Sequence, residues 1–322
     1  MAAIPFMRKF GTGAGRNAWL RSPHNPVIGY GEAWCRDFIA PSSVLVDGDT
    51  VTLYCEGGAG DRECIGRYTC GAGEVPEARW SPDPRNPLLE PGTGFDRGSV
   101  FDPAAVRFRG QTHLYYSATA GGAHAFAERG EVRAGDAPDD ETIGHAVETA
   151  DGFARDPQPV LTGRCPFAIE AGGEVVVFYV KVVAGGYRIY GARSADGVTF
   201  TPLADGRPVL DVGSAGEWDS FTVTTPKVFA DDGQFVMLYA GDDRLIDDPT
   251  GIGIAVSPDL VSWRKYPGPV FTPGQAGGFD SLSVASPVPL FVDGCWQIIY
   301  AGTARPVAEG LQSQIGVARL RA

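Results

Sequence analysis

The sequence predicts an all-β fold, a five-bladed β-propeller built from four-stranded antiparallel blades. Two observations support this prediction. A unit anchored on a proline recurs five times at a spacing of about 61 residues, and each copy contains several short strands. Glycine (44) and proline (25) make up about a fifth of the 322 residues, which implies frequent turns and few long helices. Short strands repeated around a centre are the signature of propeller blades.

The repeated unit has the same internal order in each copy. An anchoring proline is followed by an apolar strand, a glycine turn and a second strand rich in aromatic residues, most clearly in residues 218–241 and 279–302. The anchors are separated by 62, 63, 60 and 61 residues, and they are Pro41, Pro103, Pro166, Pro226 and Pro287. A period of this length indicates a repeat architecture that fills nearly the whole chain.

The blades are expected at about 34–91, 95–162, 164–212, 218–273 and 279–322, within a single domain covering 1–322. The last copy ends after its third strand. A strand-like segment within about 17–31 can supply the missing outer strand of that blade and close the ring, which would leave no open sheet edge at the seam. A TIM barrel of similar length needs eight amphipathic helices, which the sequence lacks.

Composition excludes several classes of function. The net charge of −12 disfavours nucleic acid as a partner, and no run of apolar residues is long enough for a membrane span. The N-terminus lacks the apolar stretch of a secretory signal, so we expect a cytoplasmic protein, although a mature secreted chain would look the same. The six cysteines do not show metal-binding spacing. We therefore expect no cofactor and no metal ligand set.

The candidate site is expected at one rim of the central channel. In an up-and-down blade the innermost strand begins, and the second strand ends, on the same face. The side chains that this rule gathers at one rim are Asp37, Glu56, Asp96, Asp102, Arg164, Lys181, Asp219, Lys227, Asp242, Asp280 and Arg305. Carboxylates with a few cations among them are typical of an acid/base site.

These acids are not equally good catalytic candidates. Asp96, Asp219 and Asp280 recur as Phe-Asp or Trp-Asp in three copies, and a repeated aspartate favours a structural turn over catalysis. Asp102 differs because it breaks the repeat. It is the only carboxylate directly before an anchoring proline, where the other copies have Ala40, Cys165, Thr225 and Ser286. Asp102 is therefore the best single catalytic candidate.

These motifs resemble the five-bladed propeller glycosidases, such as glycoside hydrolase families 43, 32 and 130. The resemblance rests on the Trp/Phe-Asp-Ser, Tyr-Ala-Gly and Ile-Gly-x-Ala elements of residues 218–263 and 279–318, and it covers essentially the whole chain. It implies a carboxylate on the inner strand of each of the first three blades. Asp102-Pro103 matches the second of these positions, and Asp37 could supply the first. The resemblance also allows a structural calcium ion in the channel.

The third position departs from the family pattern. The Glu-Cys-Pro of family 32 reads Arg164-Cys165-Pro166 here. An arginine cannot donate a proton near neutral pH, whereas glycoside hydrolysis needs a protonated acid on the leaving oxygen. Another rim acid would have to take that role, with Glu56 or Asp219 as the expected donor. Arg164, Lys181 and Lys227 could instead bind an anionic group on the ligand.

Three functional hypotheses follow. The first is a glycoside hydrolase-like enzyme, with phosphorolysis as a variant, acting on a small saccharide or glycoconjugate at the channel mouth. The second is a glycosidase-fold enzyme with non-hydrolytic chemistry, such as a lyase, cyclase or transferase, which Arg164 favours. The third is a non-catalytic propeller that binds a ligand. The first is preferred because Asp102 and the acid-rich rim accompany the fold resemblance.

Overall fold

The computed structural model describes residues 6–10, 18–77, 79–121, 141–183, 186–244, 249–306 and 312–321. In these ranges the chain is nearly all-β, and the only helical elements are short 3-10 turns. They are η1 (Phe6–Lys9), η3 (Ala33–Cys35), η4 (Ala72–Glu77) and η5 (Ala204–Gly206). The described residues contain no helix that is long and apolar enough to cross a membrane. The prediction of an all-β chain is confirmed.

The strands form antiparallel sheets in sequence order. The first sheet contains β2 (Phe38–Asp47), β3 (Thr50–Ala59), β4 (Arg62–Gly71) and β5 (Ser81–Pro82). The second contains β6 (Ser99–Phe108), β7 (Gln111–Thr119), β8 (Thr142–Thr149), β9 (Gly152–Arg155) and β10 (Leu161–Thr162). In both sheets the first three strands follow one another along the chain. The second strand pairs antiparallel with both the first and the third.

The third sheet is eight-stranded and consists of two antiparallel sets. One set is β11 (Arg164–Ala171), β12 (Glu174–Val183), β13 (Gly186–Ser194) and β14 (Thr201–Pro202). The other is β15 (Thr222–Asp231), β16 (Gln234–Asp242), β17 (Gly251–Ser257) and β18 (Arg264–Lys265). A single parallel pair between Tyr187 and Thr222 joins the two sets.

The two ends of the chain meet in the fourth sheet. It contains β19 (Ser283–Val292), β20 (Cys295–Thr303), β21 (Gln314–Leu320) and the N-terminal strand β1 (Trp19–Arg21). Trp19 pairs with Leu320, and Ile28 forms an isolated bridge with Ile315. The N-terminal segment therefore supplies the outer strand of the last sheet.

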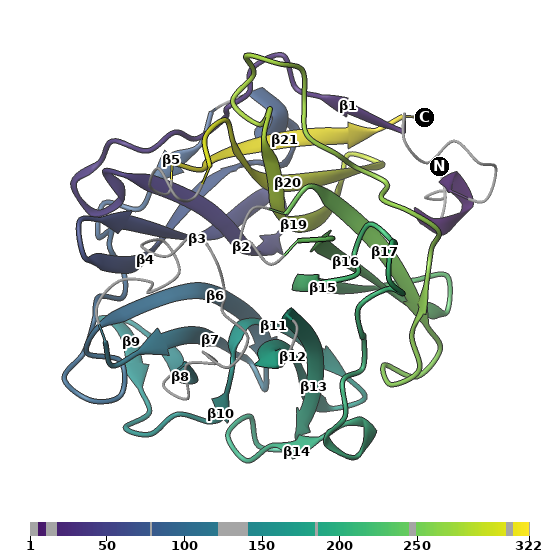
Figure 1. Ribbon diagram of the computed structural model, residues 1–322. Helices are drawn as coiled ribbons and strands as arrows, with labels where there is room; N and C mark the ends of the chain where they lie inside the picture. The colour runs from purple at the N-terminus through teal and green to yellow at the C-terminus, as the bar shows by residue number, and fades with distance from the viewer. Residues whose placement is uncertain are drawn as a thin grey trace.

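The first strand of each set lies innermost. Figure 1 shows the sheets arranged around a common centre, with β2, β6, β11, β15 and β19 nearest to it. These five strands contact one another in sequence order, and β19 also contacts β2. Apolar side chains fill the space between neighbouring sheets, as where Ala104 and Val106 of β6 meet Val175 and Val177 of β12.

The inner strands bend at the anchoring prolines. The pairing register shifts at Pro103, Pro166, Pro226 and Pro287, and a comparable shift follows Pro41. The residue before each of the four later prolines has a left-handed φ; these residues are Asp102 (49°), Cys165 (49°), Thr225 (46°) and Ser286 (48°). Bulges of this kind re-aim a side chain and bend the strand. The repeat therefore gives Asp102 a backbone position different from that of an ordinary strand residue.

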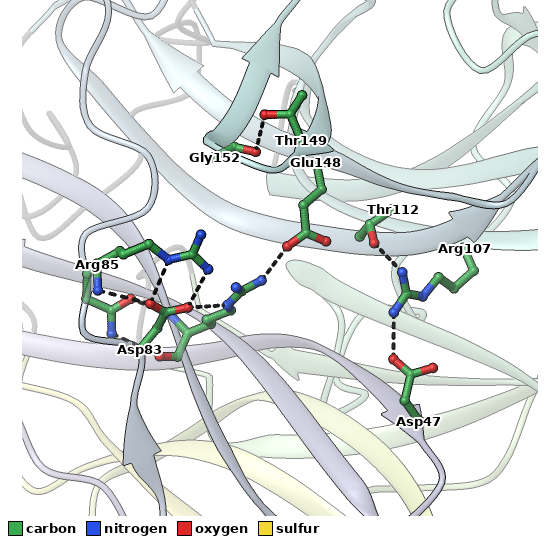
Figure 2. Close-up of polar contacts among 10 residues, drawn as sticks. Asp47, Asp83, Arg85, Arg107, Thr112, Glu148, Thr149 and Gly152 are labelled. Carbon is green, nitrogen blue, oxygen red and sulfur yellow. Dashed lines mark hydrogen bonds and ion pairs between the residues drawn. The ribbon is translucent and has the colours of Figure 1, made fainter.

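Ion pairs connect the first two sheets at the ends of β2 and β6 that lie away from the anchoring prolines (Figure 2). Arg67 donates to Asp83 at 2.8 Å and to Glu148 of β8 at 2.6 Å. Arg107 of β6 donates to Asp47 of β2 at 2.6 Å. The Asp83–Arg67–Glu148 chain is largely shielded from solvent, whereas the Arg107–Asp47 pair is exposed. The shielded chain is the one expected to stabilise the contact between the sheets.

Candidate active site

Asp102 lies at the bulge of β6 and is 6% exposed. Its Oδ2 accepts a hydrogen bond from Ser117 Oγ of β7 at 2.9 Å and another from the backbone N–H of Cys165 of β11 at 3.2 Å. The same Cys165 N–H lies 2.8 Å from Ser117 Oγ. One carboxylate oxygen is therefore held between two neighbouring sheets.

Glu56 of β3 is in direct contact with Asp102. The Asp102 backbone N–H donates to Glu56 Oε2 at 2.6 Å. Burial, followed by the nearby Asp102 and Glu63 carboxyl groups, raises the pKa of Glu56 well above its usual range. The surroundings of Glu56 therefore favour its protonated form beside Asp102.

Two further buried acids lie near Arg164. Glu63 of β4 is 2% exposed, and Glu141, directly before β8, is also buried. Arg164 Nη1 is 3.7 Å from Glu141 Oε1. Burial raises the pKa of Glu63 to about 8, with Arg164 opposing the shift and the Asp102 and Glu141 carboxyl groups adding to it. The arginine at the position where the resemblance implies an acid is thus paired with Glu141 and influences Glu63 electrostatically.

Lys227 of β15 is the second buried cation and is 2% exposed. Its ammonium lies 5.2 Å from the centre of the Phe167 ring. Burial lowers the pKa of Lys227, while the charges of Asp102, Cys165 and Glu56 act in the opposite direction. Lys227 is therefore in the electrostatic field of the Glu56–Asp102 pair.

We refer to these side chains as the central cluster. Its members come from the first three sheets, and they are Glu56, Glu63, Asp102, Ser117, Glu141, Arg164, Cys165 and Lys227. Protonated and ionisable carboxyl groups beside buried cations can donate and accept protons and can hold a charged or polar ligand. No group of three or more His, Cys, Asp or Glu side chains suited to a metal ion occurs in the part of the chain that the structure describes.

The structure gives the repeated aspartates a common structural environment. Asp96, Asp219 and Asp280 are each buried, and each accepts a hydrogen bond from a tyrosine and pairs with a cation of an outer strand. The partners are Tyr116 (3.3 Å) and Arg155 (2.6 Å), Tyr239 (2.9 Å) and Lys265 (2.7 Å), and Tyr300 (2.9 Å) and Arg21 (2.7 Å). These contacts match the structural interpretation of the repeat. They occupy the carboxyl group of Asp219, which the sequence offered as a proton donor.

Four other predicted site residues have partners outside the central cluster. Asp37 is partly exposed and binds Arg36 at 2.9 Å and the Gly60 N–H at 2.7 Å. Lys181 lies against the Tyr179 and Tyr190 rings, at 5.6 and 5.2 Å. Asp242 is fully buried and accepts hydrogen bonds from Arg244 and Thr250, and Arg305 is exposed. The structure thus brings together Glu56, Asp102, Arg164 and Lys227, but not these four.

Two open surface cavities lie elsewhere. One of about 690 Å³ lies between β1 and residues 273–280 and includes Asp280 in its lining. The other, of about 490 Å³, is lined by Arg193, Arg207 and neighbouring residues. Neither lining contains a member of the central cluster.

Sequence reasoning missed Glu63 and Glu141. Both stand at the start of the third strand of their sheet: Glu63 is the second residue of β4, and Glu141 directly precedes β8. In an antiparallel sheet the third strand begins on the same side as the first strand begins and the second ends. The rim rule used only the first and second strands, and extending it to third-strand starts would have included both glutamates.

Comparison with solved structures supports the fold. The chain superposes on a protein described as a glycoside hydrolase with a TM-score of 0.69 and 15% identity, covering 94% of this chain and 93% of the other. A thermostable family-43 glycoside hydrolase gives 0.67 and 19%, covering 93% of both chains. The β-1,2-mannobiose phosphorylase of Listeria innocua gives 0.68 and 13%, covering 94% and 96%.

The sequence comparisons found no match. No protein-family model matches the chain, and no curated protein matches it. The relation to the solved enzymes is therefore one of structure, at identities where likeness establishes the fold alone. The resemblance expected from the sequence is confirmed at that level: the chain has the fold of the propeller glycosidases and phosphorylases.

Proposed function

We propose that this protein is a glycosidase-like enzyme that acts on a small saccharide or glycoconjugate at the central cluster by carboxyl acid/base catalysis. The observation that carries the proposal is the contact between Glu56 and Asp102, in which burial and the neighbouring acids raise the pKa of Glu56 and so favour its protonated form. A carboxylic acid that retains its proton at neutral pH can protonate a leaving oxygen, which is the step that glycoside cleavage requires.

The residues divide into roles on this proposal. Glu56 donates the proton in place of the acid that Arg164 replaces. Asp102, oriented by Ser117 and the Cys165 N–H, accepts the proton of an attacking water, whose oxygen bonds to the anomeric carbon as the bond to the leaving oxygen breaks. Arg164 and Lys227 supply the positive charge that offsets the buried acids and orients the substrate. The reaction as proposed needs no metal or cofactor.

We also infer that the strand sets are five blades closed into a ring. The support is the cyclic contact of β2, β6, β11, β15 and β19, together with the pairing of β1 with β21. The single parallel pair between β13 and β15 is a junction between two blades rather than a continuous sheet. On this interpretation the central cluster lies where the first four blades converge, with Lys227 as the member from the fourth.

A second candidate function is a non-hydrolytic reaction on the same fold, such as that of a lyase, cyclase or transferase. The observation that favours it is the same Glu56–Asp102 contact. In glycosidases the two catalytic carboxyl groups stand roughly 5–9.5 Å apart, so that substrate, or substrate and water, fits between them. Two carboxyl groups that shift each other's pKa instead titrate as a coupled pair, not as a separate acid and base.

The test is turnover of a panel of aryl glycosides with and without inorganic phosphate. Wild type is expected to release the aryl group from at least one glycoside, and Asp102→Asn is expected to reduce the rate by at least about 100-fold, in line with the loss of an acid/base group. Phosphate dependence would identify phosphorolysis. Asp232→Asn is the matched control, because Asp232 lies in an exposed turn and pairs with Arg8.

Absence of turnover on every glycoside, with an unchanged fold, would contradict the proposal and favour the second candidate. Turnover that Asp102→Asn leaves intact would also contradict it, because the reaction would then occur elsewhere.

A further inference from the structure

Lys227 is a buried cation whose ammonium has no protein acceptor. It is 2% exposed, and its Nζ makes no hydrogen bond or ion pair with the residues that the structure describes. The ammonium lies 5.2 Å from the centre of the Phe167 ring. An ammonium has three donors, and burying it without acceptors is unfavourable. A side chain in this state is suited to an acceptor that comes from outside the protein.

Lys227 is buried but not sealed, because 2% of its surface stays exposed. Binding of a ligand group requires that it reach the ammonium through this small opening. The Asp102 and Glu56 carboxyl groups influence Lys227 electrostatically without forming an ion pair with it. Asp102 is instead held by Ser117 and Cys165.

The charge around Lys227 limits what it can bind. Arg164 is already beside Glu141. Burial favours the protonated form of Glu56, which leaves Lys227 opposite the Asp102 carboxyl group next to the proposed reaction centre. A ligand group with a single negative charge is matched by the one ammonium. A doubly charged phosphate would place a second negative charge near Asp102, which disfavours it.

We propose that Lys227 binds the carboxylate of an acidic sugar, so that the substrate class is a uronic acid or another saccharide bearing one carboxylate. The inference deepens the proposed function and rests on it for the saccharide part of the substrate. The carboxylate accepts hydrogen bonds from the Lys227 ammonium, and the Phe167 ring covers one side of the cation. Charge-assisted hydrogen bonds in such a shielded position are about twice as strong as neutral ones.

The test is direct binding, measured by calorimetry with glucuronate, galacturonate, glucose and inorganic phosphate as probes. Wild type is expected to bind at least one uronate at least 10-fold more tightly than glucose or phosphate. Lys227→Met, which keeps the length of the side chain and removes its charge, is expected to lose that preference. Lys181→Met is the matched control, because Lys181 lies on β12 against two tyrosine rings outside the central cluster.

Equal binding of glucose and uronate, a uronate preference that survives in Lys227→Met, tighter binding of phosphate than of either uronate, or no binding of either uronate would overturn the inference. Turnover is measured separately with aryl glucuronides and aryl glucosides. Uronate binding without turnover of any glycoside would contradict the proposed reaction and leave the Lys227 site supported. Turnover of neutral glycosides without uronate binding would do the reverse.

Discussion

At the scale of single residues, burial determines the protonation of the central cluster. Glu63 has almost no exposed surface, and its surroundings contain Asp102, Glu141 and Arg164. Burial disfavours the ionised form more than Arg164 favours it, so the balance leaves Glu63 protonated at neutral pH with a pKa of about 8. The cluster can therefore contain several acids in a small volume without an equal number of negative charges.

This protonation makes stability depend on pH. Because the pKa of Glu63 is higher in the folded chain than in the unfolded chain, its stabilising effect is complete below about pH 4.5 and is lost as pH rises toward about 8. In wild type, this effect is expected to lower the free energy of unfolding by on the order of 4 kcal/mol across that range. Glu63→Gln has no carboxyl group to ionise here, so the variant should not show this decrease. Chemical denaturation at several pH values measures the difference between the variant and wild type.

The control for this measurement is Glu77→Gln, because Glu77 is exposed at the end of η4. Its pH profile should follow that of wild type. Parallel profiles for Glu63→Gln and wild type would show that Glu63 is ionised across the range, against the account.

At the scale of the secondary-structure elements, the repeated aspartates connect the segments before the inner strands β6, β15 and β19 to outer strands of the same sets. Asp219 accepts from Tyr239 of β16 and from Lys265 of β18, so one carboxyl group joins the loop before β15 to the second and fourth strands of the same set. Burial and the Asp219 charge raise the pKa of the Tyr239 hydroxyl, which keeps it a donor over the physiological range. The repeat in the sequence is thus a repeat of this connection.

Asp219→Asn tests the structural role. The variant keeps the shape of the side chain but removes the charge partner of Lys265, and we expect the free energy of unfolding to fall by about 2 kcal/mol. Chemical denaturation at pH 7 measures it. Asp61→Asn, in the exposed β3–β4 turn, should change the value by less than about 0.5 kcal/mol. A fully stable Asp219→Asn variant with reduced turnover would instead support the catalytic role that the sequence allowed.

At the scale of the whole molecule, the sequence predicted the repeat and much of the site. The anchoring prolines mark the bulges of the inner strands, and the N-terminal strand pairs with the last one, because periodicity and edge pairing are visible in residue order. Asp102 was identified because it interrupts the repeat. Both inferences needed only a comparison of the copies with one another.

The other site residues could not be predicted, because membership of the site depends on how deeply a side chain is buried, and residue order does not reveal that. Asp37 and Glu56 are both acids close to the predicted rim, yet one makes a partly exposed ion pair and the other is in contact with Asp102. Lys181 and Lys227 follow the same rule and lie in different surroundings. Which of two equivalent positions points to the centre is decided by the bend of the strand and by the packing of its neighbours.

The central claim is that the convergence of three sheets keeps a protonated carboxyl group in contact with Asp102 at neutral pH. The most direct test is a pH titration followed by carbon-13 NMR, with the label on the glutamate side-chain carboxyl groups. We predict two resonances that stay at their protonated positions through pH 7 in wild type, one absent from Glu56→Gln and the other, that of Glu63, absent from Glu63→Gln. If the resonance that Glu56→Gln removes instead ionises near the ordinary glutamate pKa of about 4.3, the acid/base account of this site is contradicted.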